Sequence, residues 1–186
     1  MIWLLLACST APAATTDCPL RARELGVEDP RVGSAIVVRK GERRLQVFQD
    51  GQSAGCWKVG LATGYETGDK LREGDMKTPE GWYRTSDKPA SSHYSAIAVH
   101  YPNAEDAQRG LDESVIDEPT YESILSALEK DKKPSQQTSM GGEILIHGGG
   151  GADDWTLGCL GMENEDIDAL RSHLPEGMRV NLLILP

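Results

Sequence analysis

Residues 146–162 read Ile146-His-Gly-Gly-Gly-Gly-Ala-Asp-Asp-Trp-Thr-Leu-Gly-Cys-Leu-Gly-Met162, a glycine-rich connection between two short apolar runs. His147 stands at its start and Cys159 near its end. A thiol is mostly protonated at neutral pH, so a nucleophilic cysteine needs a base, and an imidazole can take its proton. The stretch therefore predicts a strand that ends at His147 and a candidate pair in which Cys159 is the nucleophile and His147 the base.

The residue before the cysteine is Gly158, which allows a backbone conformation that is costly for other residues. The amides of Gly158 and Cys159 can then converge on one oxyanion. Two alternatives stay open. Lone cysteines and histidines usually serve packing and local hydrogen bonds. The pair can also bind zinc together with Asp153 or Asp154, although the spacing lacks the close ligand pairs of common zinc sites.

The rest of the chain reads as short β-strands joined by glycine-containing turns. β-Branched or alternating apolar runs predict seven strands, at residues 34–39, 43–48, 55–61, 81–84, 96–100, 143–147 and 179–185. Apolar residues at helical spacing predict one helix after Pro119 and another with Asn164 as its N-cap. The pattern predicts a mainly β domain with a few helices, of the α+β class.

Length and charge narrow the classes of protein. At 186 residues the chain fits one domain with a sizeable core. It carries 19 Lys and Arg against 29 Asp and Glu, a formal net charge of −10. A nucleic-acid partner is therefore not expected, because phosphate binding needs a basic face.

The N-terminal residues 1–16 read as an export leader and tether. Leu5-Leu6-Ala7-Cys8 resembles a bacterial lipobox and predicts a lipid anchor at Cys8, while ordinary cleavage after Ala13 is the alternative. Residues 17–33 follow as an N-terminal helical segment, in which Asp17 to Leu25 can form a short helix that Gly26 ends. We therefore expect an exported protein of the bacterial periplasm or cell envelope, with the main domain at 34–186.

Export gives the four cysteines different expected roles. Cys8 is the candidate for lipidation and Cys159 for catalysis, which leaves Cys18 and Cys56. In an oxidising compartment these two can form a disulfide that ties the N-terminal segment to the domain. Two buried free thiols are the alternative.

Two blocks of the chain resemble the L,D-transpeptidase catalytic domain of the YkuD type, over roughly residues 34–186. The first is Gly74-Asp-Met-Lys-Thr-Pro-Glu-Gly-Trp-Tyr83, similar to the family's G-D-x-x-T-P-x-G-x-[FY] segment. The second runs from His147-Gly148 to Thr156-x-Gly158-Cys159, of the [ST]-x-G-C type. Tyr101-Pro102-Asn103 and the short loop between the histidine and the cysteine look most like the YafK-like murein branch.

The resemblance implies a YkuD-like β-sandwich with mixed sheets and a peripheral helix. It implies a cysteine peptidyltransferase that acts on peptidoglycan stem peptides through a thioester, without cofactor or metal. Cys159 carries over as nucleophile, His147 as general base and acid, and the carbonyl of Gly148 as the group that orients the imidazole. The backbone amides of Leu157, Gly158 and Cys159 match the oxyanion site.

The chain departs from the family pattern at two positions of this loop. Leu157 stands where most members have histidine, and Gly161 where many have arginine or asparagine. The second change removes an anchor for a substrate carboxylate or backbone, and the candidates to replace the lost cation are Lys70, Arg72 and Lys77. A further candidate in the site is His100, which ends a predicted strand and is the rival or auxiliary base.

The residues leave three functions open. The acyl group can pass to an amine, which is transpeptidation, or to water. The hydrolytic alternative is an L,D-carboxypeptidase or endopeptidase, including one that releases a peptidoglycan-attached protein. A non-catalytic peptidoglycan-binding module that kept the scaffold is the third.

Overall fold

The computed structural model describes residues 18–62 and 68–186. The expected leader and tether at 1–16, with the lipidation candidate Cys8, lie outside the described residues. No helix in the described part is long and apolar enough to cross a bilayer.

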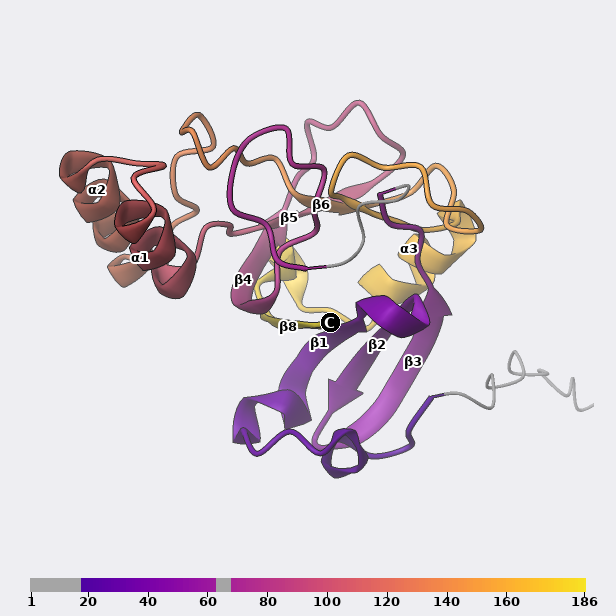
Figure 1. The fold of residues 1–186 in the computed structure, drawn as a ribbon. Coiled ribbons are helices and arrows are strands. Elements are labelled where there is room, and N and C mark those ends of the chain that lie inside the picture. Colours follow the sequence, from indigo (N-terminus) through magenta and orange to yellow (C-terminus); the bar gives the residue numbers. More distant parts are fainter. Residues whose placement is uncertain (1–17, 63–67) are drawn as a thin grey trace, which may run out of the picture.

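The strands of the described chain form one mixed sheet in the order β3-β2-β1-β8-β4-β5-β6-β7 (Figure 1). Their bounds are β1 Ala35–Arg39, β2 Arg44–Gln49, β3 Gln52–Lys58, β4 Gly81–Asp87, β5 Ala96–Val99, β6 Leu145–His147, β7 Leu160–Gly161 and β8 Asn181–Leu185. The β1–β8 and β6–β7 pairs are parallel and the other pairs antiparallel.

The sheet curls so that its two ends share one core. Alternation along β1 and β2 buries Ile36 and Leu45 in the same cluster as Ile97 of β5 and Ile146 of β6. These four side chains are fully buried, and each contributes roughly 1.5–3 kcal/mol of hydrophobic free energy. The expected mainly β, α+β architecture, a sandwich built from mixed strands, is confirmed.

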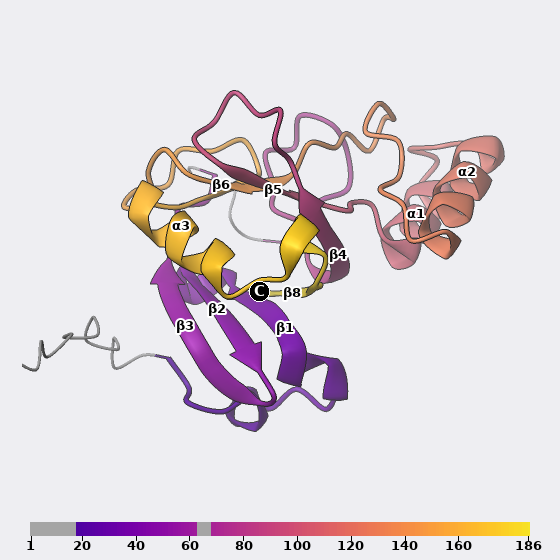
Figure 2. The ribbon, with the colours of Figure 1, turned by 180° about the vertical axis from the view of Figure 1, so that it is seen from behind.

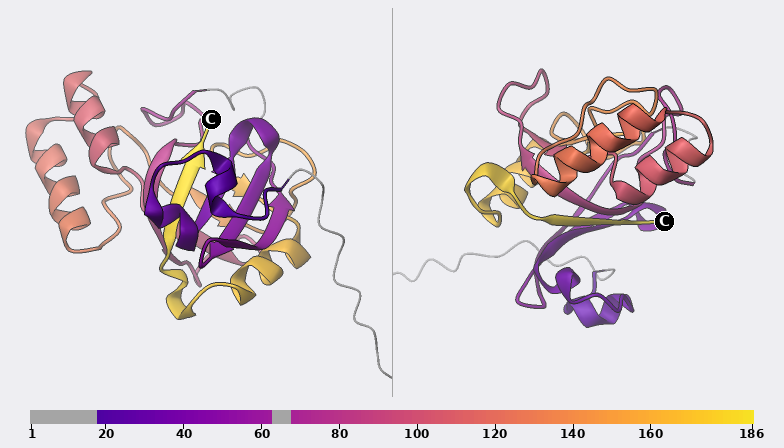
Figure 3. Two further views of the ribbon diagram at one scale, coloured as in Figure 1. Left: turned by 90° about the horizontal axis from the view of Figure 1, so that it is seen from below. Right: turned by 90° about the vertical axis from the view of Figure 1, so that its left-hand side faces the viewer.

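Three α-helices flank this sheet in the described chain: α1 Ala104–Asp112, α2 Glu118–Glu129 and α3 Asn164–Ser172. The first two pack against each other at one end of the molecule, and α3 lies on the other side (Figures 2 and 3). Ile124 of α2 and Ile167 and Leu170 of α3 are buried in the core, as their spacing predicted.

Some local expectations were wrong. Helix α1 was not predicted; its signal is a capping box in which Asn103 and Asp106 exchange hydrogen bonds. Strand β7 was not predicted either, because it is too short to show any periodicity. Asn164 is the first helical residue of α3 rather than its N-cap, and Glu163 caps the helix without a side-chain hydrogen bond.

The segment before β1 covers the outer face of the β1–β3 half. It holds two short 3-10 helices, Ala22–Leu25 and Pro30–Ser34, and the first ends at Gly26 in the left-handed conformation. Ala22 and Val32 pack on Val37 of β1 and Phe48 of β2 in a second apolar cluster.

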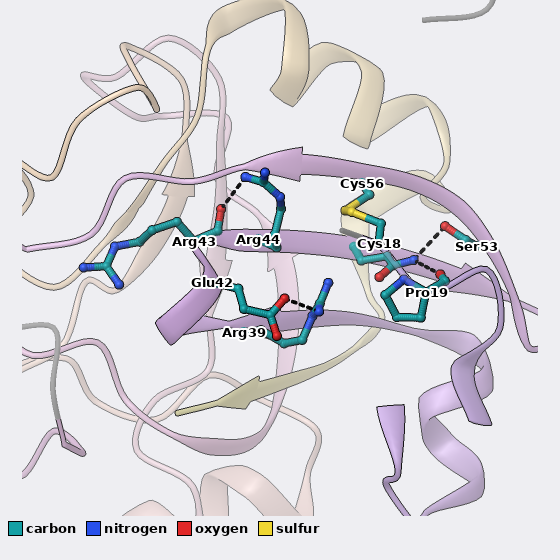
Figure 4. Close-up of a disulfide and its surroundings, with 9 residues drawn as sticks. Cys18, Pro19, Arg39, Glu42, Arg43, Arg44, Ser53 and Cys56 are labelled. Atoms are coloured by element: carbon teal, nitrogen blue, oxygen red, sulfur yellow. Dashed lines mark hydrogen bonds and ion pairs between the residues drawn. A yellow bond between two sulfur atoms is a disulfide. The ribbon is translucent and has the colours of Figure 1, made fainter. Parts of the chain in front are cut away.

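A disulfide joins Cys18 to Cys56 of β3, as expected from the cysteine count (Figure 4). The amide nitrogen of the Gln46 side chain adds two hydrogen bonds beside it, to the carbonyl of Pro19 at 2.6 Å and the hydroxyl of Ser53 at 2.8 Å. The bridge closes a loop with a sequence separation of 38. It therefore fastens the start of the described chain to the outer strand of the sheet.

Candidate active site

The parallel pairing of β6 with β7 sets the relation of the two candidate catalytic residues. Ile146 lies opposite Leu160, and both belong to the main core. Because side chains alternate between faces, the residues beside them face outward. Leu145 and Cys159 indeed meet in a separate apolar cluster. His147 follows Leu145 by two residues on that outer face, so it is a diagonal neighbour of Cys159.

The His147 ring is held on three sides. Its Nδ1 lies 2.8 Å from the carbonyl oxygen of Gly148. Since a carbonyl only accepts, Nδ1 carries the proton and Nε2 is left with the lone pair. The ring of His93 stacks on it with centroids 3.9 Å apart, and the ring of Trp155 meets it edgewise at 5.6 Å. The side chain is 1% exposed, so its orientation is fixed before any substrate arrives.

Burial lowers the pKa of His147, and the neighbouring His93 acts in the same direction. The hydrogen bond to the Gly148 carbonyl opposes this shift. The imidazole is consequently neutral at neutral pH, which is the state of a general base.

The Cys159 thiol is partly buried and donates to the backbone carbonyl of Glu143 at 3.5 Å. Burial raises its pKa, and a hydrogen bond from the backbone of Leu145 opposes the rise. Cysteine and histidine therefore rest as a neutral thiol and a neutral imidazole, not as an ion pair. A thiolate forms only when a base removes the proton.

The loop before the cysteine is fixed by the Thr-Pro block quoted above. Gly158 has φ +120°, and a Cβ there would lie 2.8 Å from the backbone oxygen of Lys77. Its carbonyl accepts a hydrogen bond from the Thr78 hydroxyl at 3.0 Å. The Thr156 hydroxyl donates to the Cys159 carbonyl at 2.8 Å and accepts from the Gly158 amide at 3.3 Å. The two sequence blocks are thus one structural unit.

The two unusual positions of the loop have different surroundings. Leu157 is 74% exposed at the loop tip. Gly161 is enclosed, because it exchanges backbone hydrogen bonds with Gly60 and because a Cβ on it would lie 2.5 Å from the Gly150 oxygen. A larger side chain at 161 does not fit here.

The four candidates for substrate contacts are placed very differently. Lys70 is buried, and its ammonium donates to the Arg72 carbonyl at 2.9 Å and to Asp75 at 2.8 Å, so it is not available as a surface cation. The Arg72 side chain is exposed, while Lys77 is half-buried with its backbone against Gly158.

His100 does not belong to the pair of catalytic candidates. Its Nε2 is 2.9 Å from the Ser86 hydroxyl, and burial lowers its pKa to about 4. Ala96 lies opposite His147, and His100 comes four residues later, roughly 13 Å along the strand. That His100 is a rival or auxiliary base stays a prediction, and His93 is the histidine that lies against the imidazole.

The described residues do not supply the set of ligands that the zinc alternative needs. The Asp154 carboxylate is held by Arg43 at 2.7 Å and by the Leu61 amide at 2.8 Å. Within residues 18–62 and 68–186, no three His, Cys, Asp or Glu side chains come together as metal ligands.

Comparison with known proteins agrees with the sequence resemblance. The model of the YkuD family, the L,D-transpeptidase catalytic domain, matches residues 33–182. The chain belongs to this family.

Its relatives are longer proteins. YafK of Escherichia coli K12, provisionally named an L,D-transpeptidase, is 30% identical over 148 residues, which cover 75% of this chain and 47% of YafK. The helical cell shape determining protein Pgp2 of Campylobacter jejuni, as its K307A mutant, is 25% identical with a TM-score of 0.55, over 81% of this chain and 46% of Pgp2. The unsubstituted Pgp2 gives 24% and 0.54 over the same shares. The chain spans about half the length of these proteins.

Proposed function

We propose that this chain is a cysteine peptidyltransferase that acts on peptidoglycan stem peptides through a thioester acyl-enzyme. One observation carries the proposal: the Gly148 carbonyl fixes the His147 tautomer, so the basic Nε2 is free on the face of the sheet that holds Cys159. Membership of the L,D-transpeptidase family supports the choice of substrate.

The first half-reaction forms the thioester. The thiol leaves the Glu143 carbonyl by rotation about its Cα–Cβ bond, and Nε2 of His147 takes its proton as sulfur attacks the peptide carbonyl. Amides of Leu157, Gly158 and Cys159 hold the oxyanion, and the Gly158 amide gives up its 3.3 Å hydrogen bond to the Thr156 hydroxyl to do so. The C–N bond then breaks, and the imidazolium of His147 returns its proton to the leaving amine.

The second half-reaction decides the product. An amine from another peptide attacks the thioester and gives a new amide, whereas water gives a carboxylate; in both cases Cys159 leaves as the thiol. The L,D-hydrolase is therefore an alternative at the same site, including release of a peptidoglycan-attached protein. Similarity to YafK and Pgp2 does not separate the two outcomes.

The proposal places the protein in the bacterial periplasm or cell envelope. A disulfide between Cys18 and Cys56 suits an oxidising compartment. Lipidation of Cys8 remains part of the proposal and is tested by the mass of the N-terminal peptide from envelope-derived protein.

The activity is tested with defined muropeptides, with and without an amine acceptor, followed by product masses. Cross-linked or exchanged products identify the transferase, and shortened products the hydrolase. Cys159→Ala and His147→Gln should each lower turnover at least a thousandfold, while His173→Gln, at the end of α3, should not change it. Wild-type protein with an intact thiol that converts no stem peptide refutes the proposal.

A thiol probe separates the enzyme from a binding module. Cys159 is the free cysteine of the described residues, so peptide mapping resolves its alkylation from that of Cys8. Base-assisted reactivity should fall at least tenfold in His147→Gln. Alkylation at a rate that does not depend on His147 supports a non-catalytic module.

A further inference from the structure

Cations gather around Glu143 and His100 in a chain whose formal net charge is −10. Glu143, whose backbone contacts Cys159, bridges Lys88 and Lys133. Asp131 bridges Arg84 and Arg179, and the charges of these three residues and of Lys133 all act on the buried His100. Four cations against two carboxylates leave this patch positive, as a site for an anionic ligand requires.

Glu143 connects the patch to the nucleophile. Its backbone carbonyl accepts the Cys159 thiol at 3.5 Å, and its carboxylate is bound by Lys88 and, at 3.4 Å, by Lys133. Both ammonium groups are therefore held by the side chain of the residue whose backbone contacts the Cys159 sulfur. Glu143 also has φ +53°, a conformation that non-glycine residues rarely adopt and that concentrates at functional sites.

The surrounding backbone holds the lysines in place. The Lys88 amide donates to the Ala96 carbonyl of β5 at 3.1 Å. The Gln136 side chain accepts from the Glu143 amide at 2.8 Å and donates to the Pro134 carbonyl, next to Lys133, at 2.8 Å. Figure 1 shows both connecting segments, the one after β4 and the one before β6, on the same side of the sheet.

The ion pairs of Glu143 are open to exchange. The Glu143 side chain is 53% exposed and each lysine side chain 26%. Exposed pairs of this kind add little to stability, so replacing the Glu143 carboxylate with another carboxylate costs the fold little. Two ammonium groups that already bridge one carboxylate are spaced to bridge a second.

We propose that Lys88 and Lys133 form a carboxylate-binding subsite for the peptide substrate, in which a substrate carboxylate displaces that of Glu143. The identity of the peptide rests on the proposed function. A stem peptide offers three carboxylates: on the glutamyl residue, on the diaminopimelate side chain and at the C-terminus. The subsite selects peptides that carry one of them free and discriminates against the carboxamide.

Binding tests this without turnover. Titration calorimetry on Cys159→Ala uses a stem tetrapeptide and its three singly amidated forms. One of the three amidations should weaken binding about tenfold. The double variant Lys88→Met/Lys133→Met should bind the unmodified tetrapeptide more weakly by the same factor, and that amidation should not weaken its binding further. Lys132 is an exposed neighbouring lysine, so Lys132→Met is the matched control. It should bind all four peptides as the Cys159→Ala protein with its lysines intact does. Equal loss on amidation with and without the two lysines overturns the subsite.

Glu143→Gln gives the opposite sign. Removal of the internal carboxylate should tighten binding of the unmodified tetrapeptide several-fold. If Glu143 is merely structural, the variant should bind the tetrapeptide more weakly or not at all. Either of those two results contradicts displacement. If these binding differences appear but wild-type protein converts no stem peptide, the subsite stands and the proposed function fails. If turnover occurs without the binding differences, the proposed function stands and the subsite fails.

Discussion

The β1–β3 half and the β5–β7 half of the sheet are built differently. The first has strands of five to seven residues, is covered on its outer face by the segment before β1 and is fastened by a disulfide. The second has β6 of three residues and β7 of two, and its outer face carries Cys159 and His147. Regular pairing stabilises the first half, whereas short strands leave the second room for the loops that hold reactive groups.

The largest expected effect on activity comes from comparing one glycine in each half, Gly158 beside Cys159 and Gly51 in the other half. Gly158 and Gly51, in the β2–β3 turn, both have positive φ, but only at Gly158 does a Cβ meet backbone, while at Gly51 it meets nothing. Gly158→Ala should lower kcat/KM about 10²–10³-fold because it displaces the oxyanion amides. Gly51→Ala should cost about 1 kcal/mol of stability and leave kcat/KM unchanged. Comparable losses of activity in both variants would contradict the division of roles.

The disulfide should act on stability alone. Replacing Cys18 and Cys56 together with alanine should lower the free energy of unfolding by about 2–4 kcal/mol, because the unfolded chain is no longer constrained. Denaturant titration measures the loss, and kcat/KM of the folded variant should stay within twofold. A large fall in kcat/KM at temperatures where the variant is folded would show that the two halves are coupled.

Thr78 should act on the site more than on the fold. Thr78→Val keeps the shape but loses the hydrogen bond to the Gly158 carbonyl, so kcat should fall about tenfold. Thr78→Ser retains the hydroxyl and should recover most of the activity. Equal kcat values for the two variants would exclude the hydroxyl as the link.

The smallest effect concerns pH. The base must be neutral, so activity should fall as pH drops through the pKa of His147. Burial lowers this pKa below the ordinary value near 6.5, and the charge of His93 lowers it further. His93→Phe keeps a stacked ring but removes its charge, so the acidic limb of kcat/KM should move up by less than one pH unit. A limb that stays in place or moves down would show that His93 does not act on the imidazole.

The two halves also differ in how much of them the sequence predicts. Runs of β-branched and apolar residues identified β1 and β2, which are buried on both faces, and the spacing of Ile167 and Leu170 identified α3. β7 was missed because two residues show no period, and its pairing depends on the long-range contact of Ile146 with Leu160. Cys159 and His147 stood out as residue types, whereas His93 and Glu143 are set beside them only by the fold. No local pattern marks those two.

The central claim is that Cys159 carries the acyl group, and trapping that intermediate tests it most directly. Wild-type protein is mixed with a stem tetrapeptide, quenched in acid within the first turnovers and analysed by intact mass and peptide mapping. We predict an adduct with the mass of the acyl portion on Cys159, released by hydroxylamine and missing from Cys159→Ala. Product formed by Cys159→Ala at the wild-type rate, or an adduct on another residue, would contradict the account.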